Sequence, residues 1–278
     1  MDNKRQIISF VLNTGGSGSH FIHKLISSHR SVETNIDPQN RDVLTKFCKN
    51  INDGNELTKK DIQTIDLKLR PNKKKVMWFV APHSYSSVLP ARDWNENNLA
   101  CMLEVFKQYK QKSDYNIKVA FLIRNPFDQA ASIIRRFGYK VNIKEVSYRI
   151  ISYYDFINKM MENFNNEDIL LIKYEELCNN TDRVLDLIWK WLEIDGASIS
   201  LKPYCAIERK TAYKYPACFF IYPDHFLKYI SVKYGYSMKL PEHISMINRL
   251  DEIKIRSINV ARKIKYFIKK PDDSYIFT

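Results

Sequence analysis

The sequence has little of what several classes of protein require. Among 278 residues there are 7 glycines and 10 prolines, which is too few for a collagen-like or low-complexity chain. Its 5 cysteines are widely spaced and form no Cys-x-x-Cys pair, so we expect neither a disulfide framework nor a zinc site. No apolar run approaches the ~20 residues that cross a bilayer, and residues 7–12 are too few for a signal-peptide core. We therefore expect a soluble, cytoplasmic protein with reduced thiols, no bound metal and no membrane partner.

Composition and charge describe a globular protein that attracts anions. Hydrophobic residues make up 45% of the chain and charged residues 27%, so one domain spanning residues 1–278 can bury a sizeable core. The 44 lysines and arginines exceed the 31 acidic residues and give a net charge of +13. A field of that sign favours nucleic acid, an acidic membrane surface or a polyphosphorylated small molecule.

Short apolar segments alternate with segments of helical periodicity. This alternation is typical of a parallel sheet covered on both faces by helices, an α/β architecture. Further helices are predicted near residues 224–234 and 241–267. The predicted strands are residues 7–12, 75–80, 117–123 and 168–172.

A glycine-rich loop, residues 14–20, follows the first predicted strand and precedes a helix. Its glycines allow backbone N–H groups to converge on one anion, and the helix N-terminus adds partial positive charge. Ser17 and Ser19 add hydroxyl donors. The lysine of a nucleotide triphosphatase loop is missing, which disfavours a magnesium-dependent enzyme of that class. A turn without a ligand is the alternative.

A second candidate phosphate site follows the strand 117–123. Arg124 stands at the carboxyl end of that strand, where ligands bind in open α/β sheets. Ser132 lies two helical turns into the next predicted helix. A guanidinium fork and a hydroxyl together suit a phosphate. The alternative is a surface arginine and a helical serine.

These segments occur in an order that resembles the sulfotransferases using 3'-phosphoadenosine-5'-phosphosulfate (PAPS). Members of that family carry a Ser-Gly-[Ser/Thr] loop after the first strand, here Ser17-Gly18-Ser19. A later strand ends in Arg-Asn-Pro-x-Asp with a serine eight residues after the arginine, as in Arg124 and Ser132. Residues 170–177 resemble a third landmark, a strand followed by Tyr-Glu-[Asp/Glu]-Leu. The resemblance covers roughly residues 5–195.

The resemblance implies a three-layer fold of the P-loop type, with a central parallel sheet of about five strands flanked by helices and with extra C-terminal helices. It implies that the loop holds the 5'-phosphosulfate and that Arg124 and Ser132 hold the 3'-phosphate. Tyr174 matches a position near the adenine, although a core tyrosine is the competing interpretation. Arg209-Lys210 partly resembles a segment that closes over the 3'-phosphate. The implied donor-binding residues are Gly15, Gly16, Ser17, Gly18, Ser19, His20, Arg124, Ser132, Tyr174, Arg209 and Lys210.

The catalytic groups depart in part from the family pattern. Gly16 stands where members carry Lys or Arg against the leaving group, so His20, Lys24 or a residue of the C-terminal region is expected to supply the cation. His83 follows a buried strand, at the place where members of the family carry their general base. A neutral imidazole can accept a proton near pH 7, which suits that role. A surface histidine is the alternative, and Glu145 would then be the next candidate base.

The sequence thus predicts sulfuryl transfer from PAPS, without a metal, to a hydroxyl or amine of a small-molecule acceptor, of which a natural product is one option. Two other classes remain open. One is a P-loop kinase or NTPase-like nucleotide-binding protein. The other is a basic nucleic-acid-binding module, for which the 17 tyrosines would offer stacking surfaces. The scattered lysines and the lack of a nucleic-acid motif favour an enzyme with no nucleic-acid partner.

Overall fold

The computed structural model describes residues 6–35, 44–72, 74–80, 96–137, 143–196, 214–216, 225–236 and 245–247. The chain divides into two compact units. The first consists of Met1–Asn125 and Tyr148–Lys210, and the second of Pro126–Ser147 and Thr211–Thr278. The single domain expected from the sequence stays a prediction.

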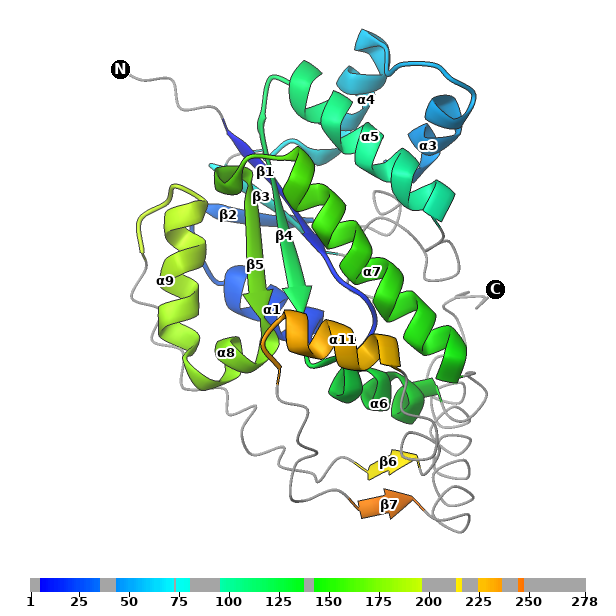
Figure 1. Cartoon of the computed structure of the whole chain (residues 1–278). Helices are drawn as coiled ribbons and strands as arrows, with labels where there is room; N and C mark the ends of the chain where they lie inside the picture. Colours follow the sequence, from blue (N-terminus) through cyan, green and yellow to red (C-terminus); the bar gives the residue numbers. More distant parts are fainter. Residues whose placement is uncertain are drawn as a thin grey trace, which may run out of the picture. The chain divides into compact units, whose positions relative to one another are not determined.

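A five-stranded parallel sheet forms the centre of the first unit, with the strand order β2-β3-β1-β4-β5 (Figure 1). The four strands predicted from apolar runs are confirmed. The edge strand β2 was not predicted, because its sequence Val-Glu-Thr-Asn has no apolar run. The strands are β1 (Ile7–Leu12), β2 (Val32–Asn35), β3 (Val76–Val80), β4 (Asn116–Ile123) and β5 (Ile169–Lys173).

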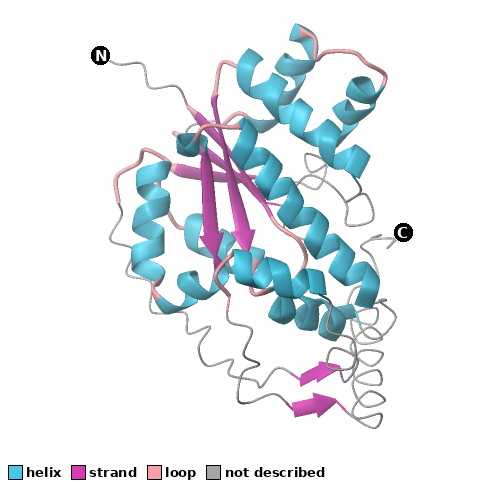
Figure 2. Cartoon of the chain, viewed as in Figure 1, coloured by secondary structure: helices cyan, strands magenta, loops and turns pink. Residues whose placement is uncertain are grey.

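Helices connect the parallel strands, as crossover connections require (Figure 2). The long helix α7 crosses the boundary between the units, and its residues from Tyr148 onward belong to the first. The helices of the first unit are α1 (Ser19–Ile26), α3 (Thr45–Asn52), α4 (Lys59–Leu69), α5 (Glu96–Lys112), α7 (Ile143–Asn163), α8 (Tyr174–Asn179) and α9 (Thr181–Trp191), with a 3-10 turn at Asn166–Asp168.

The two faces of the sheet are covered by different helices, which makes the first unit three-layered. Alternate residues of a strand point to opposite faces. Ile7 and Val11 of β1 pack into one core with buried residues of α1 and α9. On the other face, Phe10 packs edge-on against Phe106 of α5, with ring centroids 5.2 Å apart. Phe121 of β4 contacts Tyr153 of α7 in the same way. The expected three-layer P-loop-type fold is confirmed.

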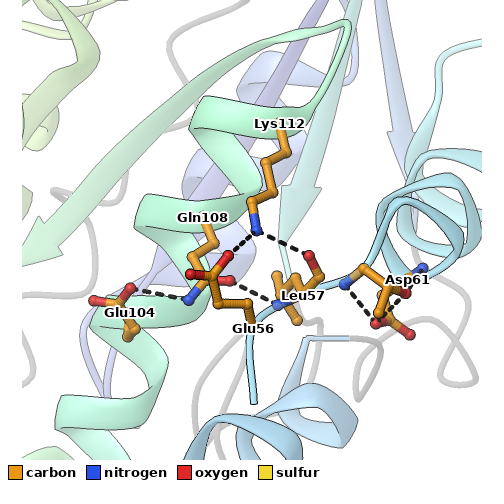
Figure 3. A network of polar contacts seen from close by, with 7 residues as sticks. Glu56, Leu57, Asp61, Glu104, Gln108 and Lys112 are labelled. Atoms are coloured by element: carbon orange, nitrogen blue, oxygen red, sulfur yellow. Dashed lines mark hydrogen bonds and ion pairs between the residues drawn. The ribbon is translucent and has the colours of Figure 1, made fainter. Parts of the chain in front are cut away.

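Polar contacts join α5 to the segment that enters α4 (Figure 3). The Leu57 N–H donates to Gln108 Oε1 at 2.7 Å. Lys112 Nζ donates to Glu56 at 2.8 Å and to the Leu57 carbonyl at 3.0 Å. Because Leu57 is buried, the two bonds to its N–H and carbonyl groups satisfy backbone atoms that have little access to water.

The second unit contains α6 (Pro126–Phe137), β6 (Lys214–Pro216), α11 (His225–Lys233) and β7 (Ser245–Ile247). Strands β6 and β7 form a parallel pair. The helix predicted near residues 224–234 is confirmed by α11. The helix predicted over 241–267 is wrong at Ser245–Ile247, where the backbone pairs with β6 instead. Among the described helices, none is long and apolar enough to cross a membrane.

Candidate functional site

The three sequence landmarks meet at one edge of the sheet in the first unit. Strands β1 and β4 are neighbours, and so are β4 and β5. The last residue of β1, Leu12, lies beside Phe121, two residues before the end of β4, and Ile123 and Lys173, the last residues of β4 and β5, lie side by side. The glycine-rich loop, Arg124 and Tyr174 therefore leave the sheet together at its carboxyl edge, where ligands bind in this architecture.

The loop has the backbone of an anion site. Gly16 and Gly18 adopt positive φ angles of 81° and 96°, in the left-handed region that favours glycine. Gly18 is the N-cap of α1, and the first turn of α1 contains no acidic side chain. The helix N-terminus therefore presents its partial positive charge without a neighbouring carboxylate on α1.

The Ser17 hydroxyl is available to bind a ligand at this loop. The side chain is fully buried, and its Oγ has no hydrogen-bond partner in the described part of the chain. The Nδ2 of buried Asn13, the residue before the loop, also has no hydrogen-bond partner in the described part of the chain. A buried polar group without a partner costs about 1–3 kcal/mol. An acceptor oxygen of a bound phosphate would remove that cost, so the donor set suits a phosphate.

Arg124 is fixed beside the loop. Its side chain is buried, with 6% of the residue exposed, and its Nη1 donates to the Gly16 carbonyl at 2.8 Å. The guanidinium carbon lies 4.6 Å from the centroid of the Tyr174 ring, a cation–π contact. The Arg124 carbonyl accepts from the Tyr154 hydroxyl of α7 at 2.9 Å. Both the backbone and the head group of this arginine are thus held.

Tyr174 packs against the loop at the same edge of the sheet. A Cβ at Gly18 would lie 2.3 Å from the Tyr174 ring, so the ring lies directly against this glycine. Phe21 of α1 packs edge-on against the ring, with centroids 6.4 Å apart. Tyr174 therefore contacts both the loop and Arg124. Its proximity to an adenine stays a prediction.

Glu175 ties the end of β5 to the end of β4. Its Oε1 accepts from the Asn125 N–H at 2.9 Å. Leu177, the last residue of the same motif, is fully buried in the core. In the Tyr-Glu-Glu-Leu segment, the Tyr174 ring thus packs against Arg124 and the Glu175 carboxylate binds the Asn125 N–H. The Leu177 side chain fixes the segment in the core.

Two tyrosines of α7 contribute to the site without having been predicted. The Tyr153 hydroxyl lies 2.7 Å from the Leu12 carbonyl and 3.1 Å from the Leu122 carbonyl. Tyr154 holds the Arg124 carbonyl, as described above. Both rings are buried, so their sequence signal is that of core positions on a helix, which does not separate them from ordinary packing residues.

The predicted substitute cations lie on α1. The side chains of His20 and Lys24 are exposed, whereas Ile22 and Leu25 carry the buried face of the helix. His23 is half-buried, and desolvation, followed by the neighbouring His20, lowers its pKa.

Of the four remaining predicted residues, the structure describes one, Ser132. Ser132 lies in α6, within the second unit. His83, Arg209 and Lys210 lie outside the described residues. Strand β3 ends at Val80, beside Val11 of β1. Within the described ranges, no three His, Cys, Asp or Glu side chains are grouped as metal ligands.

Comparisons with known proteins gave matches among solved structures. Neither protein-family models nor curated protein sequences gave a match. Among solved structures, a sulfotransferase domain from the curacin biosynthetic pathway matches with a TM-score of 0.53 and 14% identity, over 85% of this chain and 99% of the other. A sulfotransferase from Alicyclobacillus acidocaldarius matches with a TM-score of 0.47 and 11% identity, over 84% and 97%. The sulfotransferase domain of the Synechococcus PCC 7002 olefin synthase gives 0.46 and 15%, over 94% and 97%.

The sheet order and the loop after β1 define an α/β protein of the P-loop type. Within that class, the likeness to the curacin-pathway domain shows that this chain has the sulfotransferase fold.

Proposed function

We propose that this protein is a sulfotransferase that moves a sulfuryl group from PAPS to a hydroxyl or amine of a small-molecule acceptor. The observation that carries the proposal is the buried Ser17 hydroxyl without a partner, in a loop whose Gly16 carbonyl is bonded by buried Arg124. A P-loop kinase would bring a lysine in this loop, and this sequence has none there.

The residues of the sheet edge would hold the donor, which supplies the sulfuryl group. Loop residues 15–19 would bind its phosphosulfate through backbone N–H groups and the Ser17 and Ser19 hydroxyls. Arg124 would bind a phosphate, with Ser132, Arg209 and Lys210 as further proposed contacts. No metal ligand is part of the proposal.

His83 is the proposed general base. It would accept the proton of the acceptor's O–H or N–H group as that oxygen or nitrogen bonds to sulfur. The bond between sulfur and the bridging oxygen breaks, and its electron pair leaves with adenosine 3',5'-bisphosphate. The substitution His83→Ala should lower turnover by roughly 10²–10⁴-fold and change the donor affinity little. Turnover close to that of the wild type would transfer the role to another group, with Glu145 the next candidate.

Calorimetric titration tests the proposed function. We expect the protein to bind adenosine 3',5'-bisphosphate in preference to ATP with magnesium and to a mixed oligonucleotide. A preference for ATP would favour the kinase class, and a preference for the oligonucleotide would favour a nucleic-acid-binding module. Ser17→Ala should weaken bisphosphate binding without lowering the melting temperature, because the hydroxyl has no partner within the described chain.

A further inference from the structure

We propose that Tyr153 sets the distance between the two phosphate subsites of the donor site and so favours a ligand that carries both phosphates. The inference rests on the proposed function, with the glycine-rich loop at the 5'-phosphosulfate and Arg124 at the 3'-phosphate, as the resemblance implies. Tyr153 is a positioning residue, because its hydroxyl acts through the backbone of two strands.

The two proposed subsites stand at the ends of two different strands. The loop follows β1, whose last residue is Leu12, and Arg124 directly follows β4, whose last residue is Ile123. The donor carries both phosphates on one ribose, so the reach between them is limited. A site that holds its two halves at the matching distance in advance binds such a ligand at a lower cost.

Pairing between β1 and β4 stops short of Arg124. The last pair in the register joins Leu12 and Phe121. Leu122 and Ile123 continue β4, but their partners in the described sheet belong to β5. The ladder between β1 and β4 therefore fixes the two strands only as far as Leu12 and Phe121.

The Tyr153 hydroxyl lies where this ladder ends. It donates to the Leu12 carbonyl at 2.7 Å and to the Leu122 carbonyl at 3.1 Å. A hydroxyl carries a single hydrogen, so one O–H group joins a carbonyl of each strand. The Tyr153 ring is fully buried and packs edge-on against Phe121, with ring centroids 6.2 Å apart. The hydroxyl therefore connects the strand that leads to the loop with the strand that leads to Arg124.

The neighbouring Tyr154 makes a different contact. Its hydroxyl donates to the Arg124 carbonyl at 2.9 Å. This bond acts at the end of β4, whereas the bonds of Tyr153 reach both strands. The two hydroxyls should therefore affect ligands with one phosphate and with two phosphates differently.

Titration with three nucleotides tests the role of Tyr153. Adenosine 3',5'-bisphosphate carries both phosphates, whereas adenosine 5'-monophosphate and adenosine 3'-monophosphate carry one each. We expect Tyr153→Phe to lower the affinity for the bisphosphate by roughly three- to tenfold, the size of one lost hydrogen bond. The affinities for the two monophosphates should stay unchanged, because each of these ligands uses one subsite alone. Tyr154→Phe should instead weaken binding of the bisphosphate and of the 3'-monophosphate together.

Three results of that titration would overturn the proposal. Equal losses for all three ligands would make Tyr153 a purely structural residue. A loss shared by the bisphosphate and one monophosphate would place its effect within one subsite. Unchanged affinity for the bisphosphate would remove Tyr153 from donor binding.

Tyr109→Phe is the matched control for the loss of a buried tyrosine hydroxyl. Tyr109 is fully buried in α5, and its hydroxyl donates to Asp66 Oδ1 at 2.7 Å. Asp66 also accepts from Ser113, three residues before β4 begins, so this contact lies toward the amino end of that strand. Tyr109→Phe should lower the melting temperature and leave all three affinities unchanged. The same loss for the bisphosphate in this variant would mean that affinity follows stability, which also overturns the proposal.

If Tyr153→Phe does not fold, Phe121→Leu takes its place. It removes the ring against which Tyr153 packs, leaves the hydroxyl, and should again weaken binding of the bisphosphate more than that of either monophosphate. A wild type that fails to prefer the bisphosphate over ATP contradicts the proposed function itself. A wild type that shows this preference, with even losses in the variant, contradicts the role of Tyr153 alone.

Discussion

At the scale of single residues, two independent structural constraints at Gly18 disfavour any residue with a side chain. Its φ of 96° is strained for an L residue, and an added Cβ would meet the Tyr174 ring at 2.3 Å. Gly18→Ala should therefore lower the free energy of unfolding by more than the ~1–2 kcal/mol of a left-handed residue. It should also weaken binding of adenosine 3',5'-bisphosphate, because the ring must move and the loop with it. Chemical denaturation and calorimetry measure the two effects.

Gly54 provides the matched control for this substitution. Its φ is 79°, and a Cβ there would meet nothing within 4 Å. Gly54→Ala should thus show the backbone cost alone and leave nucleotide affinity unchanged. Equal effects of the two substitutions would mean that the contact with Tyr174 does not matter.

The lowered pKa of His23 predicts how the free energy of unfolding changes with pH. Desolvation first, and the neighbouring His20 second, lower its pKa from the ordinary 6.5, so the folded protein binds a proton less readily than the unfolded chain. The free energy of unfolding should fall as the pH drops below the unfolded pKa of about 6.5 and on through the lower folded pKa. His23→Gln should reduce that fall in denaturation curves from about pH 8 to about pH 5. Curves of identical slope would exclude His23 as the cause.

Residue types and their order along the chain predicted three segments that lie together at one edge of the sheet. The glycine-rich loop, Arg124 and the Tyr-Glu-Glu-Leu segment stood out because of their places after predicted strands. The Arg124 contact with Gly16 and the Tyr174 contact with Gly18 were not predictable, since they join residues that are over a hundred positions apart. The buried Tyr153 and Tyr154 carry no distinguishing sequence signal.

At the scale of elements, α7 is hydrogen-bonded to the carboxyl edge of the sheet through its tyrosine hydroxyls. The Tyr154 hydroxyl holds the Arg124 carbonyl at 2.9 Å in a buried position. Tyr154→Phe should lower the free energy of unfolding by about 1–3 kcal/mol, because the carbonyl loses a donor that water does not replace. It should also weaken binding of adenosine 3',5'-bisphosphate, since Arg124 is no longer held at its backbone.

Tyr148→Phe is the control on the same helix. The residue is 51% exposed, so loss of its hydroxyl should change neither stability nor affinity. If Tyr154→Phe lowered stability but left affinity intact, the α7 contact would be structural only.

Strands made of continuous apolar runs were predicted well, and strands that depend on pairing with a distant segment were not. The strands β1, β3, β4 and β5 are apolar runs buried in a parallel sheet, which leaves a clear pattern. β2 is a short, mostly polar edge strand, and β7 pairs with β6 some thirty residues earlier. Their extended form comes from hydrogen bonds to another segment, which local sequence does not encode.

At the scale of the whole molecule, the net charge of +13 should draw anionic ligands toward the protein. We expect the association rate of adenosine 3',5'-bisphosphate to fall as salt rises from about 0.05 M to about 0.5 M, because screening shortens the reach of the field. The rate for adenosine 5'-monophosphate, which carries less charge, should fall less. Stopped-flow measurements provide the comparison, and equal salt dependence for the two ligands would contradict steering by the net charge.

The contact between Gly18 and the Tyr174 ring also has a spectroscopic consequence. A glycine carries a hydrogen where other residues carry Cβ, so one Hα of Gly18 lies within the ring current of Tyr174. Its proton resonance should be displaced from the usual glycine range. With 7 glycines in the chain, the glycine region of a heteronuclear spectrum is sparse enough for that signal to be assigned. One resonance can then report, without a fluorescent probe or turnover of a substrate, on every ligand that reaches the loop.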